Sequence, residues 1–73
     1  MNRVNKTNRP LIEHTIINHF NKIVEKKGKP FISLIDKWDV EFAIQDEFNI
    51  SDYMAGKMTF DILERGKKRW KLK

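Results

Sequence analysis

Apolar residues recur at helical spacing in the N-terminal third of the chain. The set is Ile12, Ile16, Phe20, Ile23 and Val24. Pro10 suits the first turn of a helix, where its missing N–H has no cost, and Gly28 followed by Pro30 provides an end. The spacing predicts a helix over residues 10–27.

The middle of the chain opens with a short apolar run over residues 31–35, which fits either a strand or a buried helical turn. We expect one short element that ends at Asp36-Lys37, with Trp38 as a core anchor beside it. Asp39 can accept a hydrogen bond from a free backbone N–H, which predicts a second helix over about 39–48. Its apolar stripe consists of Val40, Ala43, Ile44 and Phe48.

Ser51 or Asp52 can cap a third helix, which Gly66 ends. One face of this helix is apolar and carries Met54, Ala55, Met58, Ile62 and Leu63. Beyond Gly66, Trp70 and Leu72 alternate with Arg69, Lys71 and Lys73, the period-two pattern of a strand with one apolar and one basic face. We expect this strand to pair with residues 31–35.

The pattern predicts a mainly α domain of three to four helices over residues 9–73, with a basic C-terminal tail. Residues 1–8 are polar, lack apolar periodicity and are predicted to form a flexible basic arm. A chain of this length buries only roughly 60% of the surface that its unfolded form exposes, so the core is thin. Homodimerisation through the first helix, which has Leu11 and Ile17 beside its main stripe, is an open alternative.

The absence of cysteine excludes disulfides and thiolate nucleophiles. No apolar run approaches a membrane span and no signal-peptide pattern is present, so we expect a cytoplasmic protein with no membrane partner. His14 and His19 are five residues apart and do not form the i, i+4 pair of a zinc site. With no nucleophile–base pair and no glycine-rich phosphate loop, we expect no enzyme and no cofactor or metal.

Charge is segregated along the chain, whose net charge is +5. Residues 1–32 and 53–73 each carry +5, whereas residues 33–52 carry −5. A basic face attracts phosphate backbones through its field and through counterion release, which makes nucleic acid, and duplex DNA in particular, the first expected partner. The alternative is a set of solvated helix faces that pair with each other.

Phe48-Asn49-Ile50-Ser51 and the later run Ile62-Leu63-Glu64-Arg65-Gly66 resemble the turn and the recognition-helix exit of the winged helix-turn-helix superfamily of transcriptional regulators. The resemblance covers residues 48–70. It implies a winged-helix-like fold, with a minimal or truncated wing because few residues follow Gly66. Asn49 stands where Gly is common in the family, but Asn also enters the left-handed conformation.

The resemblance implies that the outward residues of the third helix would enter the major groove. These residues are Asp52, Tyr53, Gly56, Lys57 and Phe60. Only Lys57 is a typical reader of base edges, because direct readout favours Arg, Lys, Asn and Gln. Exposed Tyr53 and Phe60 suit a protein partner at least as well.

The tail offers a second contact surface for nucleic acid, with six cations within nine positions. They are Arg65, Lys67, Lys68, Arg69, Lys71 and Lys73. Trp70 can stack on a base or sugar, or it can close the small core.

Two functions follow from the sequence. The first is a small DNA-binding protein of the helix-turn-helix or winged-helix type, a transcriptional regulator or accessory factor, that uses Tyr53, Lys57 and the tail. The alternative is a protein-interaction module, phage- or plasmid-encoded, that binds and modulates a host protein such as transcription machinery. Its expected contacts are Tyr53, Phe60, Asp39, Glu41 and Asp46.

Overall fold

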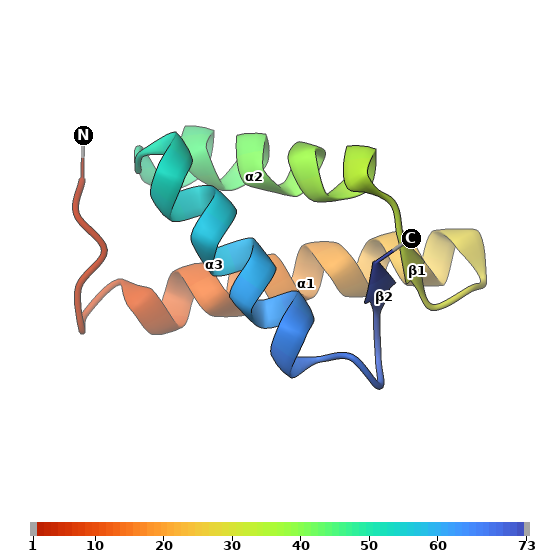
Figure 1. Cartoon of the computed structure of the whole chain (residues 1–73). Helices are drawn as coiled ribbons and strands as arrows, with labels where there is room; N and C mark the ends of the chain where they lie inside the picture. The colour runs from red at the N-terminus through yellow and green to blue at the C-terminus, as the bar shows by residue number, and fades with distance from the viewer. Residues whose placement is uncertain (1, 73) are drawn as a thin grey trace.

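The computed structural model describes residues 2–72 and shows a small, mainly helical domain, as predicted (Figure 1). Its elements are α1 (Arg9–Lys27), β1 (Phe31–Ile32), α2 (Leu34–Phe48), α3 (Asp52–Arg65) and β2 (Lys71–Leu72). α1 and α2 run side by side in opposite directions, and α3 crosses and packs against both. Among the helices of residues 2–72, none combines the length and the apolar character that a membrane span requires.

α1 agrees with the predicted helix over residues 10–27. Pro10 lies in its first turn, and it ends at Gly28, whose φ of 72° is left-handed and whose N–H donates to the Val24 carbonyl at 2.8 Å. Ile12, Ile16 and Phe20 are buried. Burial of this stripe, rather than helix propensity alone, stabilises the helix.

α2 begins five residues earlier than the predicted Asp39. Ser33 accepts a hydrogen bond from the Asp36 N–H, and the Asp36 carboxylate accepts one from the Ser33 N–H, both at 3.0 Å. This reciprocal capping box starts the helix inside the apolar run, so the predicted single element ending at Asp36-Lys37 and the Asp39 cap were wrong. Trp38 is 48% exposed, and its prediction as a core anchor was also wrong. At about 100° per residue, Trp38 lies on the opposite side of the helix from buried Val40.

The α2–α3 turn and α3 follow the prediction. Asn49 adopts a left-handed φ of 53°, and the Ser51 hydroxyl accepts a hydrogen bond from the Met54 N–H at 3.1 Å. α3 buries Ala55, Met58, Thr59, Ile62 and Leu63. These residues meet α1 and α2 in one core, which also contains Ile32, Ile44, Ile50 and Trp70.

The tail pairs with the β1 region, as expected. β1 and β2 form a parallel two-stranded sheet in which Phe31 is opposite Lys71 and Ile32 is opposite Leu72. The pairing is limited to these residues, because residues 33–35 cap and begin α2. Ile32 is fully buried, which anchors the small sheet to the helices.

The N-terminal segment, residues 2–8, contacts the helical body. The Asn2 N–H donates to the Asn49 carbonyl at 2.6 Å, and Val4 packs against the core. The Asn8 side chain donates to the Arg3 carbonyl at 2.8 Å. The segment lies at the α2–α3 turn, whereas β2 lies at the other end of α2 (Figure 1). The arm and the tail therefore do not meet at one site, and the flexibility of the arm stays a prediction.

Candidate nucleic-acid interface

Trp70 anchors the C-terminal segment, by which we mean residues 66–72. The side chain is 3% exposed, and its ring centroid lies 5.5 Å from that of Phe20. Its indole N–H donates to the Asn21 side-chain oxygen at 3.2 Å, which satisfies the polar edge of the ring. Of the two roles considered for Trp70, the structure therefore shows the core role, and a ring buried in this way is not available to stack on a base.

Gly66 makes this anchoring possible. A Cβ at this position would lie 2.5 Å from two Trp70 ring carbons, closer than real contacts allow. The Gly66 carbonyl also accepts the N–H groups of Arg69 and Trp70 at 2.8 and 2.9 Å. The chain therefore folds back directly after α3, and the Lys71 N–H reaches the Pro30 carbonyl at 2.8 Å.

The cations of the C-terminal segment face solvent around this anchor. They are Lys67, Lys68, Arg69 and Lys71. The Arg69 guanidinium lies 4.8 Å from the centroid of the Trp70 ring. This cation–π contact holds the guanidinium against the face of the ring. The Lys67 ammonium lies 3.2 Å from a Glu64 carboxylate oxygen, and because both side chains are exposed, solvent weakens this ion pair. Within residues 2–72, the side chains of Lys68 and Lys71 have no ion-pair or hydrogen-bond partner.

Arg65 differs from these four cations. Its guanidinium lies 2.7 Å from Glu13 and 3.1 Å from Asp61, so two carboxylates compete with any external anion. The hydrogen bond to Glu13, supported by the charge of Asp61, raises the pKa of Arg65. Arg65 is a link between α1 and α3, and we do not count it among the phosphate contacts. Lys73 lies outside the described residues.

Lys29 joins the surface from a distant part of the sequence. It is exposed and precedes Pro30, whose carbonyl accepts the Lys71 N–H. Lys29 was not among the contact residues predicted from the sequence, although it belongs to the basic N-terminal third. Its nearness to Lys71 depends on the parallel pairing of β1 with β2. The candidate surface, here called the cationic edge, consists of Lys29, Lys67, Lys68, Arg69 and Lys71.

The outward surface of α3 carries few groups suited to base readout. Tyr53, Lys57 and Phe60 are exposed, and the Lys57 ammonium lies 5.9 Å from the Tyr53 ring centroid. Asp61 and Glu64 are exposed on the same helix and would meet phosphates with the wrong sign.

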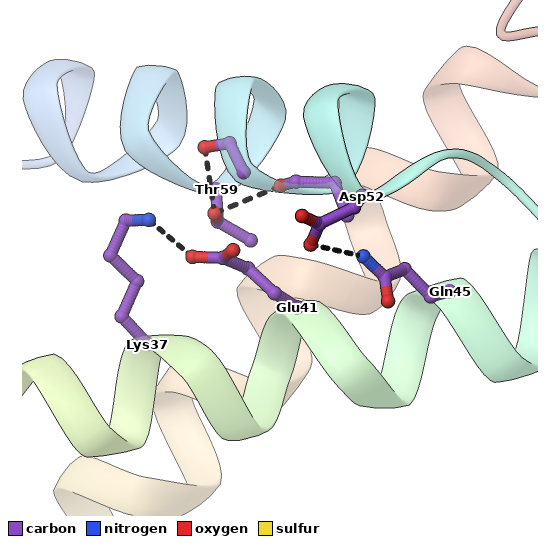
Figure 2. A network of polar contacts seen from close by, with 7 residues as sticks. Lys37, Glu41, Gln45, Asp52 and Thr59 are labelled. Atoms are coloured by element: carbon purple, nitrogen blue, oxygen red, sulfur yellow. Dashed lines mark hydrogen bonds and ion pairs between the residues drawn. The ribbon is translucent and has the colours of Figure 1, made fainter.

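Gly56 lies on the α2 side of α3 rather than on its outward surface. A Cβ at Gly56 would lie 3.3 Å from a Glu41 carboxylate oxygen, so the prediction that Gly56 faces outward was wrong. Figure 2 shows this polar layer, in which Lys37 pairs with Glu41 and the Gln45 amide donates to Asp52 at 2.8 Å. The missing side chain at Gly56 leaves room for the Glu41 carboxylate between the two helices.

Glu41 was expected to contact a protein partner, but it is 8% exposed and paired with Lys37. The prediction of Glu41 as a contact residue was therefore wrong. Asp39 and Asp46 are exposed on α2, as the interaction-module alternative requires. The same outer side of α2 exposes large apolar residues that were not predicted as contact residues, among them Ile35, Trp38 and Phe42. The only signal in the sequence was their own spacing of three and four.

No group of three or more His, Asp or Glu side chains that could hold a metal ion occurs in residues 2–72. Comparison of the chain with protein-family models, with curated proteins and with solved structures finds no match.

Proposed function

We propose that this chain is a small nucleic-acid-binding protein that contacts phosphate groups through the cationic edge. One observation carries the proposal: buried Trp70 fixes the C-terminal segment while the charged residues around it stay exposed. Binding would be driven by the release of counterions from the phosphate backbone. Because the backbone is held in place, less conformational freedom is lost on binding than for a free tail.

Recognition of this kind is independent of base sequence. Phosphate contacts position a protein on a duplex but carry no sequence information. The α3 surface offers only Lys57 as a typical base-reading side chain, beside Tyr53 and Phe60, which is too little to select a base sequence. We therefore propose an accessory factor rather than a regulator that selects one operator.

The assignment of the fold as winged-helix-like is part of the same proposal. In a winged-helix interpretation, α2 and α3 form the helix-turn-helix around the left-handed turn at Asn49, and β1 with β2 forms a minimal wing. The order of the elements supports this interpretation. In it, the wing rather than the recognition helix supplies the phosphate contacts.

The test is fluorescence anisotropy with a labelled random-sequence DNA duplex at several salt concentrations. With three to five phosphates neutralised, log K is expected to fall with log salt at a slope of roughly −3 to −4.5. The variant Lys67→Ala/Lys68→Ala/Lys71→Ala should flatten this slope by about 2 to 3, since each lost contact removes about 0.9.

The matched control is Lys6→Ala/Lys22→Ala/Lys26→Ala, which removes the same charge from exposed positions outside the edge. It should keep most of the slope, because it leaves the edge intact. If both variants reduced the slope of log K against log salt equally, net charge alone would drive binding. An unchanged slope in the edge variant would refute the proposal.

A protein-interaction module remains the second candidate, favoured by the exposure of Tyr53 and Phe60 on α3. Aromatic residues are enriched at the centres of protein interfaces. In a pull-down that yields a specific partner, Tyr53→Ala/Phe60→Ala should reduce recovery at least tenfold. Unchanged recovery would exclude this surface of α3.

A further inference from the structure

The outer side of α2 exposes an apolar stripe on a helix whose inner side is already committed to the core. Val40 and Ile44 are buried, whereas Ile35 is 65% and Phe42 62% exposed, with Trp38 between them. The three residues are spaced by three and four, so they form one line on the helix surface. The line extends over about two turns, or roughly 10 Å. Helices with two apolar sides are ordinarily covered on both.

The geometry matches the way a helix binds in a groove. Such helices insert large side chains at i, i+3 or i+4, and i+7, the spacing of Ile35, Trp38 and Phe42. Trp is also the residue type most enriched among side chains that dominate binding energy. Leu34, exposed one turn before Trp38, extends the same surface.

Charge decides what kind of partner fits. Asp39 and Asp46 lie seven residues apart along one flank of the stripe and are exposed. Within the part of the chain that the structure describes, neither carboxylate has an ion-pair or hydrogen-bond partner. The flank is therefore negative and unneutralised.

We propose that α2 docks into an apolar groove, rimmed by Lys or Arg, on a different protein. Ile35, Trp38 and Phe42 fill the groove, and Asp39 and Asp46 face the basic rim. The inference goes beyond nucleic-acid binding, because it uses another surface with the opposite charge. A nucleic-acid-bound copy of the chain would thereby recruit a second protein.

Two other occupants fit the charges less well. In a symmetric pair of copies, a two-fold axis through the middle of the stripe would pass beside Asp39 and bring the two Asp39 carboxylates together. An anionic membrane surface would repel the same flank, whereas interfacial helices place Lys and Arg there. A basic protein groove satisfies both the apolar line and the acidic flank.

α2 is also preorganised for docking. The Ser33–Asp36 capping box fixes its start, and the Lys27 ammonium pairs with Asp36 to tie it to the end of α1. Binding would therefore cost no helix folding, unlike the coupled folding of a disordered segment.

The experiment uses the full chain with benzoyl-phenylalanine, a photo-crosslinking residue, at Phe42 or, as a matched exposed control, at His14 of α1. The chain is expressed in the cells that naturally produce it. Irradiation should link position 42, but not position 14, to one protein other than this chain. With that protein purified, Trp38→Ala should weaken binding at least tenfold, and Asp39→Lys/Asp46→Lys should weaken it at least threefold and lower its salt sensitivity.

Crosslinks to a second copy, to lipid or to no protein would overturn the inference. So would a partner whose affinity is unchanged in Asp39→Lys/Asp46→Lys. Circular dichroism controls for folding, and His14→Ala, at an exposed position of α1, should leave the affinity unchanged. Trp38→Ala, which changes no charge, should bind the DNA duplex as the parent does, so failure of this inference and failure of the proposed function are separate results.

Discussion

The two tryptophans of the chain lie in opposite settings. Trp70 is buried against Phe20 and gives its indole N–H to Asn21. Trp38 is half exposed on α2, with acidic Asp39 beside it in sequence. The first tryptophan therefore positions its charged neighbours, whereas the second is itself available for contact.

The sign of the flanking charge distinguishes the two surfaces. Around Trp70 the exposed neighbours are cations, which suit phosphate. Along α2 the exposed neighbours of the stripe are Asp39 and Asp46, which suit a basic protein. One small domain thus presents two exposed surfaces whose flanking charges have opposite signs.

The largest predicted effect comes from truncating each tryptophan in turn. Trp70→Ala should lower the free energy of unfolding by about 3–5 kcal/mol, because it empties a core position. Trp38→Ala should lower it by less, about 1–2 kcal/mol, since about half of the side chain is exposed. Urea denaturation measures both. Comparable losses would contradict the assignment of Trp38 to a contact surface.

A second prediction compares two glycines. Gly66→Ala should lower the free energy of unfolding by about 1–3 kcal/mol, because the new Cβ would overlap the Trp70 ring. It should also weaken DNA binding, because the C-terminal segment would shift. Gly28→Ala should cost only about 1–2 kcal/mol, from its left-handed φ, because no atom lies within 4 Å of its Cβ. Thermal unfolding and anisotropy test the pair, and Gly66→Ala that binds DNA normally would contradict the anchoring role.

The sequence predicted the parts of the fold that local signals specify. α1 and α3 were correctly placed, because Pro10, Gly28, Ser51 and Gly66 mark their ends and one apolar stripe fills each. The predicted start of α2 was wrong because its capping signal, Ser33 with Asp36, overlaps an apolar run that also fits a strand.

The candidate surfaces could be predicted only in part. The tail cations were evident in the sequence, but the position of Lys29 beside Lys71 depends on long-range pairing. The neutralisation of Arg65 by Glu13, 52 residues away, likewise depends on the packing of α3 on α1. The exposure of Trp38 followed from the earlier start of α2, which includes Trp38 in the helix on the side opposite buried Val40.

The smallest predicted effect concerns the start of α2 and depends on pH. Burial raises the pKa of Asp36, but hydrogen bonds from Lys27 and Ser33 outweigh it, so the pKa lies below its ordinary 3.8. The ionised Asp36 carboxylate therefore stabilises the folded chain fully above pH 3.8, and this stabilisation is lost as pH falls through the folded-state pKa.

Asp36→Asn should accordingly cost about 0.3–1 kcal/mol at pH 7 and progressively less in acid. Denaturant unfolding of both proteins from pH 7 to pH 2 measures the difference. A difference that does not shrink in acid would contradict the role of the Asp36 charge in starting α2.

The most direct test of the account is an NMR titration of the ¹⁵N-labelled chain with a DNA duplex. The account predicts amide shifts concentrated in residues 66–72 and around Lys29, with residues 35–42 of α2 and residues 53–60 of α3 nearly unchanged. Shifts concentrated on residues 53–60 would instead indicate binding by α3 and would contradict the cationic edge as the interface.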